Sequence, residues 1–257
     1  MPLSDSLAKH KSKIVVALIL TFSSGMVDIV AFLGIFPLFT AHLTGTTVHL
    51  GQSLVLGKRT EIIAAAAIVA AFFGGSVLGR TIIEASVRRG FRRVATITLA
   101  VEAAILAFVG VAGASLGHTR APAHVYFYLA LLAGAMGMQT ATLTGIGPLT
   151  VHTTFVTGTV NKLAQLVSRI LFRSYDFLRG HGKTPENRAA QSAESTQAIF
   201  IFSIWMCYLM GAIGGTASYM RWGIRALFVP IVGMVIGIIA DIFRPLSIEE
   251  EHEQSER

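Results

Sequence analysis

The chain alternates between long apolar runs and short polar segments that are often basic. A run of about 18 or more apolar residues is long enough to cross a bilayer as a helix. The sequence predicts a transmembrane helix in each of six runs: Ile14–Phe36, Ile62–Ile82, Val94–Ala112, Val125–Leu143, Ala198–Tyr219 and Ala226–Phe243. The predicted fold is therefore an all-α membrane protein with six transmembrane helices.

The first run has an alternative interpretation as the core of a cleaved secretory signal, because lysines precede it at positions 9, 11 and 13. However, the run is longer than an ordinary signal core, and TFSSGMVD (Thr21–Asp28) offers no convincing small-residue cleavage site. We therefore expect it to remain as the first membrane helix.

Basic residues are shared unevenly between the connecting segments. With the N-terminus inside, the inner segments hold sixteen Lys and Arg residues and the outer segments hold five. Because Lys and Arg concentrate on the cytoplasmic side, we expect both termini in the cytoplasm. A seventh crossing at Leu38–Leu56 is rejected, since it would place the arginine-rich Arg80–Arg93 segment outside.

Composition agrees with one membrane domain, which we expect over residues 1–244. The chain is 53% hydrophobic and 14% charged, against roughly 25% charged in soluble domains. The net charge of +7 does not indicate nucleic-acid binding, because the basic residues form short clusters between apolar runs. The polar loop Ser174–Thr196 and the acidic cytoplasmic tail 245–257 are too short to bury a core, and we expect disorder in the tail.

Several short motifs recur in the same order in the two halves of the chain. The matched motifs are GMVD (Gly25–Asp28) with GMQT (Gly137–Thr140), GIFPL (Gly34–Leu38) with GIGPL (Gly145–Leu149), TGTTV at Thr44 with TGTVN at Thr157, and FFGGS (Phe72–Ser76) with AIGGT (Ala212–Thr216). Three crossings per half is an odd number, so the second half must run through the bilayer inverted. We expect two inverted three-helix repeats, over about residues 14–113 and 124–244, each with an interrupted Thr-Gly-Thr segment.

The interruptions have a physical cost inside a membrane. Pro37 and Pro148 end the preceding helices, and a helix then restarts with Thr44 or Thr157 as its N-cap acceptor. A helix start leaves up to four N–H groups without partners, and each costs several kcal/mol in hydrocarbon. Such a start is tolerable where protein covers it or where it lines a wet cavity. The alternative is an amphipathic interfacial helix with an ordinary threonine cap.

Four carboxyl or amide side chains fall inside the predicted spans. Asp28 lies half-way along the first helix, where an ionised carboxylate costs at least ~2.5–3.5 kcal/mol. It is either a proton- or cation-coupling group or an interhelical hydrogen-bond anchor, and Gln139 at the matching place is its candidate partner. Glu102 is the next candidate, whereas Asp241 is expected to meet Arg244 or water.

The remaining candidates are histidines, threonines and glycines. Histidine side chains can titrate near neutral pH or bind a metal, which makes His42, His49 and His152 candidates. No Cys or carboxylate lies at ligand spacing beside them, so we expect no metal site. The candidate substrate path comprises Asp28, His42, Thr44, Gly45, Thr46, Gln139, His152, Thr157, Gly158 and Thr159. The candidate helix-packing glycines are Gly74, Gly75, Gly214 and Gly215.

Four stretches, SSGMVDIVAFLG, FTAHLTGTTV, GAMGMQTATL and HTTFVTGTVNKLAQ, resemble the YoaK family of bacterial integral-membrane proteins. They occur in the family's order and cover roughly Lys13 to Phe243. Family members typically have Thr-Gly-Asn at the first motif, where this chain has Thr46 in place of the asparagine. The resemblance implies a six-helix protein of the bacterial inner membrane and supplies no activity.

These features predict a small secondary transporter or permease of unknown substrate, with Asp28 as the candidate group for proton or cation coupling. The alternative is a non-transporting membrane scaffold or sensor. A transporter should show a wet cavity at Asp28 and both Thr-Gly-Thr segments, whereas a scaffold should show them dry and hydrogen-bonded. No catalytic or cofactor motif occurs, so we expect no enzyme, no cofactor and no nucleic acid. The expected partners are the lipid bilayer and a small solute or ion, and a homo-oligomer stays open.

Overall fold

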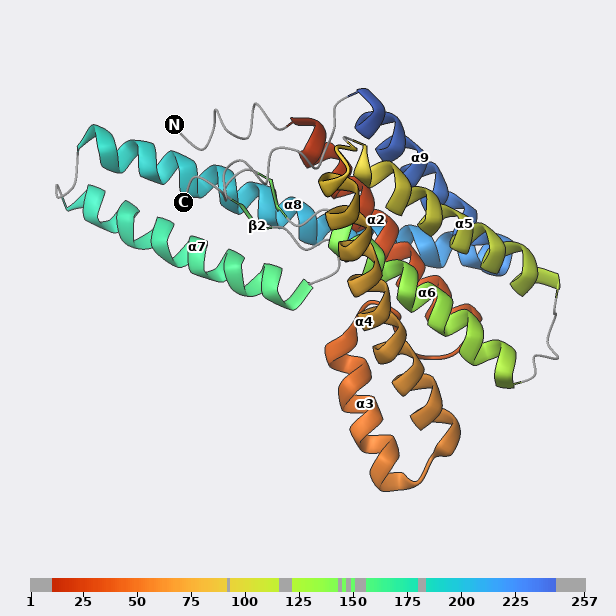
Figure 1. Cartoon of the computed structure of the whole chain (residues 1–257). Coiled ribbons are helices and arrows are strands. Elements are labelled where there is room, and N and C mark those ends of the chain that lie inside the picture. Colours follow the sequence, from red (N-terminus) through yellow and green to blue (C-terminus); the bar gives the residue numbers. More distant parts are fainter. Residues whose placement is uncertain are drawn as a thin grey trace.

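The computed structural model describes residues 11–91, 93–115, 122–142, 145–146, 149–150, 156–179 and 184–243. The regular secondary structure of this part of the chain is helical apart from one short antiparallel strand pair, in which Gly145 lies opposite Thr150 (Figure 1). The elements are α2 (Lys11–Gly34), α3 (Leu43–Leu56), α4 (Arg59–Arg88), α5 (Val94–Ser115), α6 (Pro122–Thr142), β1 (Gly145–Ile146), β2 (Leu149–Thr150), α7 (Val156–Leu178), α8 (Pro185–Trp222), the 3₁₀ helix η1 (Gly223–Leu227) and α9 (Phe228–Phe243). The acidic tail 245–257 lies outside the described residues.

Each predicted apolar run falls mainly or wholly within one helix, namely α2, α4, α5, α6, α8 or α9. Among the described residues, length and apolar composition mark four stretches as able to cross a membrane: Ser12–Gly34, Arg59–Arg88, Ala95–Ala114 and Asn187–Phe243. The last stretch contains both α8 and α9. Helix α6 is not among them, because polar residues such as His124 and Gln139 interrupt its apolar sequence. The chain is thus an all-α membrane protein at this level of detail.

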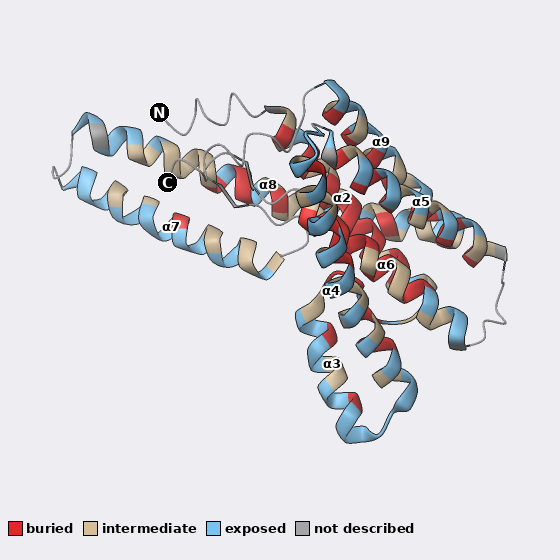
Figure 2. Ribbon diagram, viewed as in Figure 1, coloured by how far each residue is buried: buried red, intermediate tan, exposed pale blue. Residues whose placement is uncertain are grey.

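The helices form a bundle from which two hairpins project (Figure 1). In the bundle, α2 packs along α8, α4 packs along α6, and α5 contacts both α6 and α9. The main apolar core lies where these helices meet and includes Leu20 of α2, Leu99 of α5 and Met136 of α6. Burial concentrates in this region, whereas α3, α7 and the first half of α8 are mostly exposed or half-buried (Figure 2). The candidate site lies near the point where α3 leaves the bundle.

The predicted polar loop Ser174–Thr196 is wrong for most of its length. Helix α7 continues to Leu178, and α8 begins at Pro185 with the Thr184 hydroxyl accepting a hydrogen bond from the backbone N–H of Asn187 at 3.3 Å. A threonine cap followed by proline at the first helical position favours a helix start. The polar residues of this segment join the two helices across the hairpin, as in the 2.9 Å ion pair between Arg173 and Glu194.

Glycines allow two helix pairs to meet backbone to backbone. A Cβ atom at Gly25 of α2 would collide with the carbonyl oxygen of Tyr208 on α8, and one at Gly137 of α6 would collide with that of Phe72 on α4. From the opposite sides of the same interfaces, Gly211 of α8 meets the Phe22 carbonyl and Gly75 of α4 meets the Gly134 carbonyl. Close backbone approach of this kind is typical of helix association in membranes.

Two of the four predicted packing glycines do not make such contacts. A Cβ at Gly74 would have no other heavy atom within 4 Å, and one at Gly214 would lie at an ordinary 3.5 Å from the Phe22 ring. Gly75 and Gly215 do face neighbouring helices closely. Their companions are Gly79 and Gly211, which lie four residues away rather than next to them. Residues one turn apart share a helix face, whereas adjacent residues do not.

This packing predicts that Gly75→Ala destabilises the protein and that Gly74→Ala does not. The first substitution forces α4 away from α6, at a cost of about 1–3 kcal/mol for overpacking, whereas the second adds a methyl group in open space. Thermal unfolding of the detergent-solubilised protein, followed by tryptophan fluorescence, checks the difference. Equal losses of stability in the two variants would contradict the assigned α4–α6 contact.

Candidate functional site

The chain between α2 and α3 is interrupted as the sequence predicts. Helix α2 ends at Gly34, where the backbone N–H groups of Ile35 and Phe36 donate to the Ala31 carbonyl at 2.9 and 3.2 Å. Pro37 follows, and α3 begins at Leu43. Residues 35–42 are therefore a non-helical connection whose backbone groups need partners from elsewhere. In the second half, α6 ends at Thr142 and α7 begins at Val156, while Pro148 lies outside the described residues.

Asp28 supplies the partners that this connection needs. Its Oδ1 accepts hydrogen bonds from the Thr40 N–H at 2.8 Å, the Thr40 hydroxyl at 2.8 Å and the Ala41 N–H at 2.7 Å. Its Oδ2 accepts one from the Tyr208 hydroxyl of α8 at 2.6 Å. Asp28 is 2% exposed and Thr40 is 0% exposed. The carboxylate is thus dry, and it joins α2, the connection and α8.

Thr46 secures the connection from its other end. Its hydroxyl lies 3.1 Å from the Phe39 carbonyl oxygen and 3.2 Å from that of His42, within hydrogen-bonding distance of both. The N-cap of α3 is His42, with no side-chain cap, and Thr44 is exposed within the helix. The prediction of Thr44 as the N-cap is therefore wrong, because α3 begins at Leu43, one residue before it.

The other path residues are placed less centrally. Gly45 is exposed and lies against the His42 ring, which meets Phe39 edge-on at 6.0 Å. In the second half, Thr157 is exposed, while Gly158 and Thr159 are half-buried. Thr157 already lies inside α7, so it is not an N-cap either. His152 lies outside the described residues.

Gln139 joins the two halves close to Asp28. Its amide nitrogen donates to the Leu20 carbonyl at 3.0 Å and to the Ser24 hydroxyl at 2.7 Å. Both acceptors belong to α2, and Ser24 lies one helical turn before Asp28. Gln139 is fully buried. It therefore anchors α6 to α2 about one helical turn away from Asp28.

The carboxyl group of Glu102 has a different environment. It is 0% exposed, and neither oxygen has a hydrogen-bond partner among the described residues. Two contacts between α5 and α6 lie on either side of Glu102 along α5. On one side, the Thr142 hydroxyl donates to that of Thr98 at 2.9 Å, and on the other, the rings of Phe108 and Phe127 meet at 6.4 Å. Because Thr98 and Glu102 are one turn apart, they share the face of α5 that packs on α6.

Asp241 and His49 have structural partners. Asp241 is fully buried, and its Oδ2 accepts the N–H and hydroxyl of Thr96, both at 2.8 Å, in the first turn of α5. The expected partner Arg244 lies outside the described residues. His49 lies 3.2 Å from the Glu61 carboxylate, at the exposed end of the α3–α4 hairpin. Within the described chain, no group of three or more His, Cys, Asp or Glu residues is placed to hold a metal ion.

Sequence reasoning missed the two tyrosines of α8 that reach the first half. Besides the Tyr208 bond to Asp28, the Tyr219 hydroxyl donates to the Leu33 carbonyl at 3.0 Å, next to the end of α2. The available signal was two tyrosines within an apolar run, since a buried tyrosine hydroxyl usually finds a partner. Nothing in the sequence alone identifies that partner.

Comparisons with known proteins place the chain among membrane proteins without a known activity. The family model described as "Protein of unknown function (DUF1275)" matches residues 16–240. The UPF0700 transmembrane protein YoaK of Bacillus subtilis is 30% identical over 156 residues, which are 60% of this chain and 67% of that protein. No solved structure matches the chain.

The hydrogen bonds of Asp28 predict that Asp28→Ala destabilises the protein more than Asp28→Asn or Tyr208→Phe does. Asp28→Ala leaves the buried N–H groups of Thr40 and Ala41 without an acceptor, at about 1–3 kcal/mol each. Asp28→Asn keeps one acceptor oxygen and should be milder. Tyr208→Phe removes a single bond to a charged group, which contributes about 1.5–3 kcal/mol. Apparent melting temperatures in detergent check this order.

A double-mutant cycle distinguishes this network from general damage. In the Asp28→Ala background, Tyr208→Phe should have little further effect, because its partner is already gone. Tyr219→Phe is the matched control, since its partner is the Leu33 carbonyl, and its effect should persist in that background. Additive losses from Asp28→Ala and Tyr208→Phe would show that the two side chains do not interact.

Proposed function

We propose that this chain, which belongs to the family described as "Protein of unknown function (DUF1275)", is a small proton-coupled secondary transporter or permease. It is not an enzyme in this proposal. It forms a single membrane domain of the bacterial inner membrane, with both termini in the cytoplasm. Two inverted halves enclose the transport path, and the observed conformation is a closed one.

The exchange of glycine contacts between the halves supports the inverted repeat. Gly25 of α2 meets Tyr208 of α8, whereas Gly137, its counterpart in α6, meets Phe72 of α4. Exchanging the two halves replaces α2 by α6 and α8 by α4, so each contact becomes the other. The remaining contacts behave alike: Gly79 faces Met138 and Ala141, while Gly215 faces Met26 and Ile29. This agreement aligns Gly75 with Gly211, one turn away from the match that the Gly-Gly motifs predict.

Helix lengths support six crossings under the same proposal. A crossing needs about 20 residues, and the apolar stretch Asn187–Phe243 holds both α8 and α9. Helix α6 then provides a further crossing, despite its polar residues, because the fully buried Gln139 is hydrogen-bonded to α2. Three crossings per half invert the second half relative to the first.

The single observation that carries the proposal is the buried carboxyl of Glu102, which has no hydrogen-bond partner among the described residues. An ionised carboxylate at the centre of a membrane helix costs at least ~2.5–3.5 kcal/mol. A group kept there without a structural partner suits proton uptake and release. We assign this role to Glu102 rather than to Asp28, whose oxygens are occupied by four hydrogen bonds.

Asp28 acts in this proposal as a latch between the halves. Its Oδ1 holds the α2–α3 connection of the first half, and its Oδ2 holds Tyr208 of the second. Rocking of one half against the other, the usual motion of inverted-repeat transporters, would have to break the bond to Tyr208. The dry environment of Asp28 fits a closed conformation.

The same dryness favours a second candidate function, a non-transporting membrane scaffold or sensor. Neither the apolar groove beside α9 nor the cleft between α7 and α8 includes Asp28 among its lining residues. Asp28, Gln139 and Thr46 would then only hold helices together. Transport activity separates the two functions.

Proton flux in proteoliposomes tests the proposal. The vesicles are loaded with the pH-sensitive dye pyranine. Potassium efflux through valinomycin makes their interior negative, which drives protons inward, and chloride, formate, acetate or phosphate is supplied outside. The wild-type protein should admit protons faster than empty vesicles with at least one of these anions. Glu102→Gln should abolish the excess flux, because its amide cannot carry a proton. Glu84→Gln, which changes a half-exposed carboxylate of α4, should leave the flux unchanged.

Two results would overturn parts of this account. A wild-type protein that admits protons no faster than empty vesicles with every anion would favour the scaffold or sensor. A flux that is unchanged in both Glu102→Gln and Asp28→Asn would remove these two carboxyls from the mechanism while leaving transport in place.

A further inference from the structure

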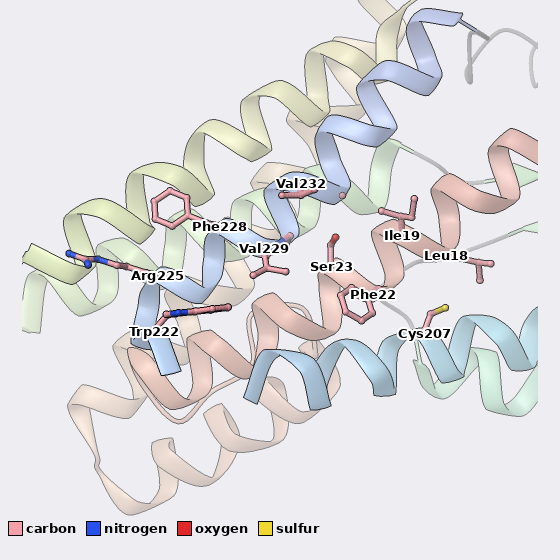
Figure 3. A pocket seen from close by; sticks show the side chains of 12 residues that line it. Leu18, Ile19, Phe22, Ser23, Cys207, Trp222, Arg225, Phe228, Val229 and Val232 are labelled. Carbon is pink, nitrogen blue, oxygen red and sulfur yellow. The ribbon is translucent and has the colours of Figure 1, made fainter. Parts of the chain in front are cut away.

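An apolar groove runs along the outside of the bundle between α2, α8 and α9. It has a volume of about 790 Å³, within the range of roughly 300–1,000 Å³ typical of small-molecule sites. Figure 3 shows it extending from Trp222 and Arg225 at one end to Leu18 and Cys207 at the other. Trp222 follows Cys207 by fifteen residues on α8, which is roughly 22 Å along a helix. The groove is therefore long and narrow.

The two ends of the groove differ in chemistry. The middle and the end at Leu18 and Cys207 are lined by aliphatic and aromatic side chains such as Ile19, Phe22 and Val232. At the other end, Trp222 is 56% exposed, and Arg225 is exposed and has no ion-pair partner within the described residues. Tryptophan is enriched where a membrane meets water, and long arginine side chains near helix ends extend toward that interface. The lining of the groove is thus apolar and suits an acyl chain, while Arg225 places one cation at the rim of this end.

We propose that this groove binds one anionic phospholipid, with an acyl chain along α2 and α9 and the phosphate at Arg225. The arginine guanidinium matches a phosphate diester in charge and in hydrogen-bonding geometry. The Trp222 ring covers the glycerol region beside it. Under the proposed orientation, this lipid belongs to the outer leaflet. The site is independent of the transport path, since Asp28 and Glu102 do not line it.

Tryptophan quenching by brominated lipids tests the proposal. The chain has two tryptophans, so Trp205→Phe leaves Trp222 as the only reporter in the full-length protein. The protein is reconstituted in mixtures of dibrominated phosphatidylcholine with unbrominated phosphatidylglycerol or unbrominated phosphatidylcholine. The relative affinity of Trp222's lipid site for the two headgroups follows from the relief of quenching.

Phosphatidylglycerol should be preferred by roughly fivefold, the ratio that corresponds to about 1 kcal/mol for one basic residue near an anionic surface. Arg225→Gln should reduce this preference to about one. Arg221→Gln is the matched control, because Arg221 is an exposed neighbouring cation that does not line the groove, and it should leave the preference unchanged.

A third variant distinguishes groove binding from simple attraction to surface charge. Val232 is 61% exposed and lines the groove, so Val232→Phe should fold normally and obstruct the acyl chain. We expect it to weaken the headgroup preference although Arg225 is retained. Equal binding of the two lipids by the wild-type protein would overturn the proposal, as would a preference that survives Arg225→Gln or Val232→Phe.

Discussion

The structure depends on how it satisfies backbone groups where its helices are interrupted inside an apolar bundle. Hydrocarbon offers no hydrogen-bond partners, so a break in a membrane helix must find them within the protein. Asp28 meets this need by accepting the N–H groups of Thr40 and Ala41 with one oxygen. Its second oxygen accepts the Tyr208 hydroxyl. One buried carboxylate therefore fixes both the course of the chain and the position of α8.

Polar side chains serve comparable purposes elsewhere in the bundle. Asp241 of α9 accepts the N–H and hydroxyl of Thr96 in the first turn of α5, and Gln139 joins α6 to α2. Glycines such as Gly25 and Gly137 then bring the helix backbones together. Each buried polar group whose bonds are described here thus joins two segments of the chain. Glu102 differs, because its carboxyl lacks a partner in the described part of the chain. For this reason we propose a functional role for Glu102, whereas the bonds of the other groups explain them as structural.

The sequence predicted much of the fold because apolar runs, prolines and glycines have local effects. It located the helices α2, α4, α5, α6, α8 and α9 and the break after Gly34, and it selected Asp28 and Gln139 as buried polar residues. It placed the N-cap of α3 at Thr44 instead of His42, and it did not show that Asp28 of α2 binds the connection before α3. It also missed Tyr208, whose partner depends on tertiary contacts, and the helical segments 174–178 and 185–196, although the Thr184 cap and Pro185 are local signals for the start of α8. The Gly-Gly motifs did not show that Gly75 and Gly215 make close contacts while Gly74 and Gly214 do not, since only the facing helix shows which glycine of a pair is in contact.

Hydrogen exchange of the α2–α3 connection measures its central interaction directly. In lipid nanodiscs, mass spectrometry can follow deuterium uptake in peptides that cover residues 38–43. The account predicts that the Thr40 and Ala41 amides are protected in the wild-type protein about as strongly as those of α5. It also predicts that Asp28→Ala exposes them while α5 stays protected. Rapid exchange of these amides in the wild-type protein would contradict the role assigned to Asp28.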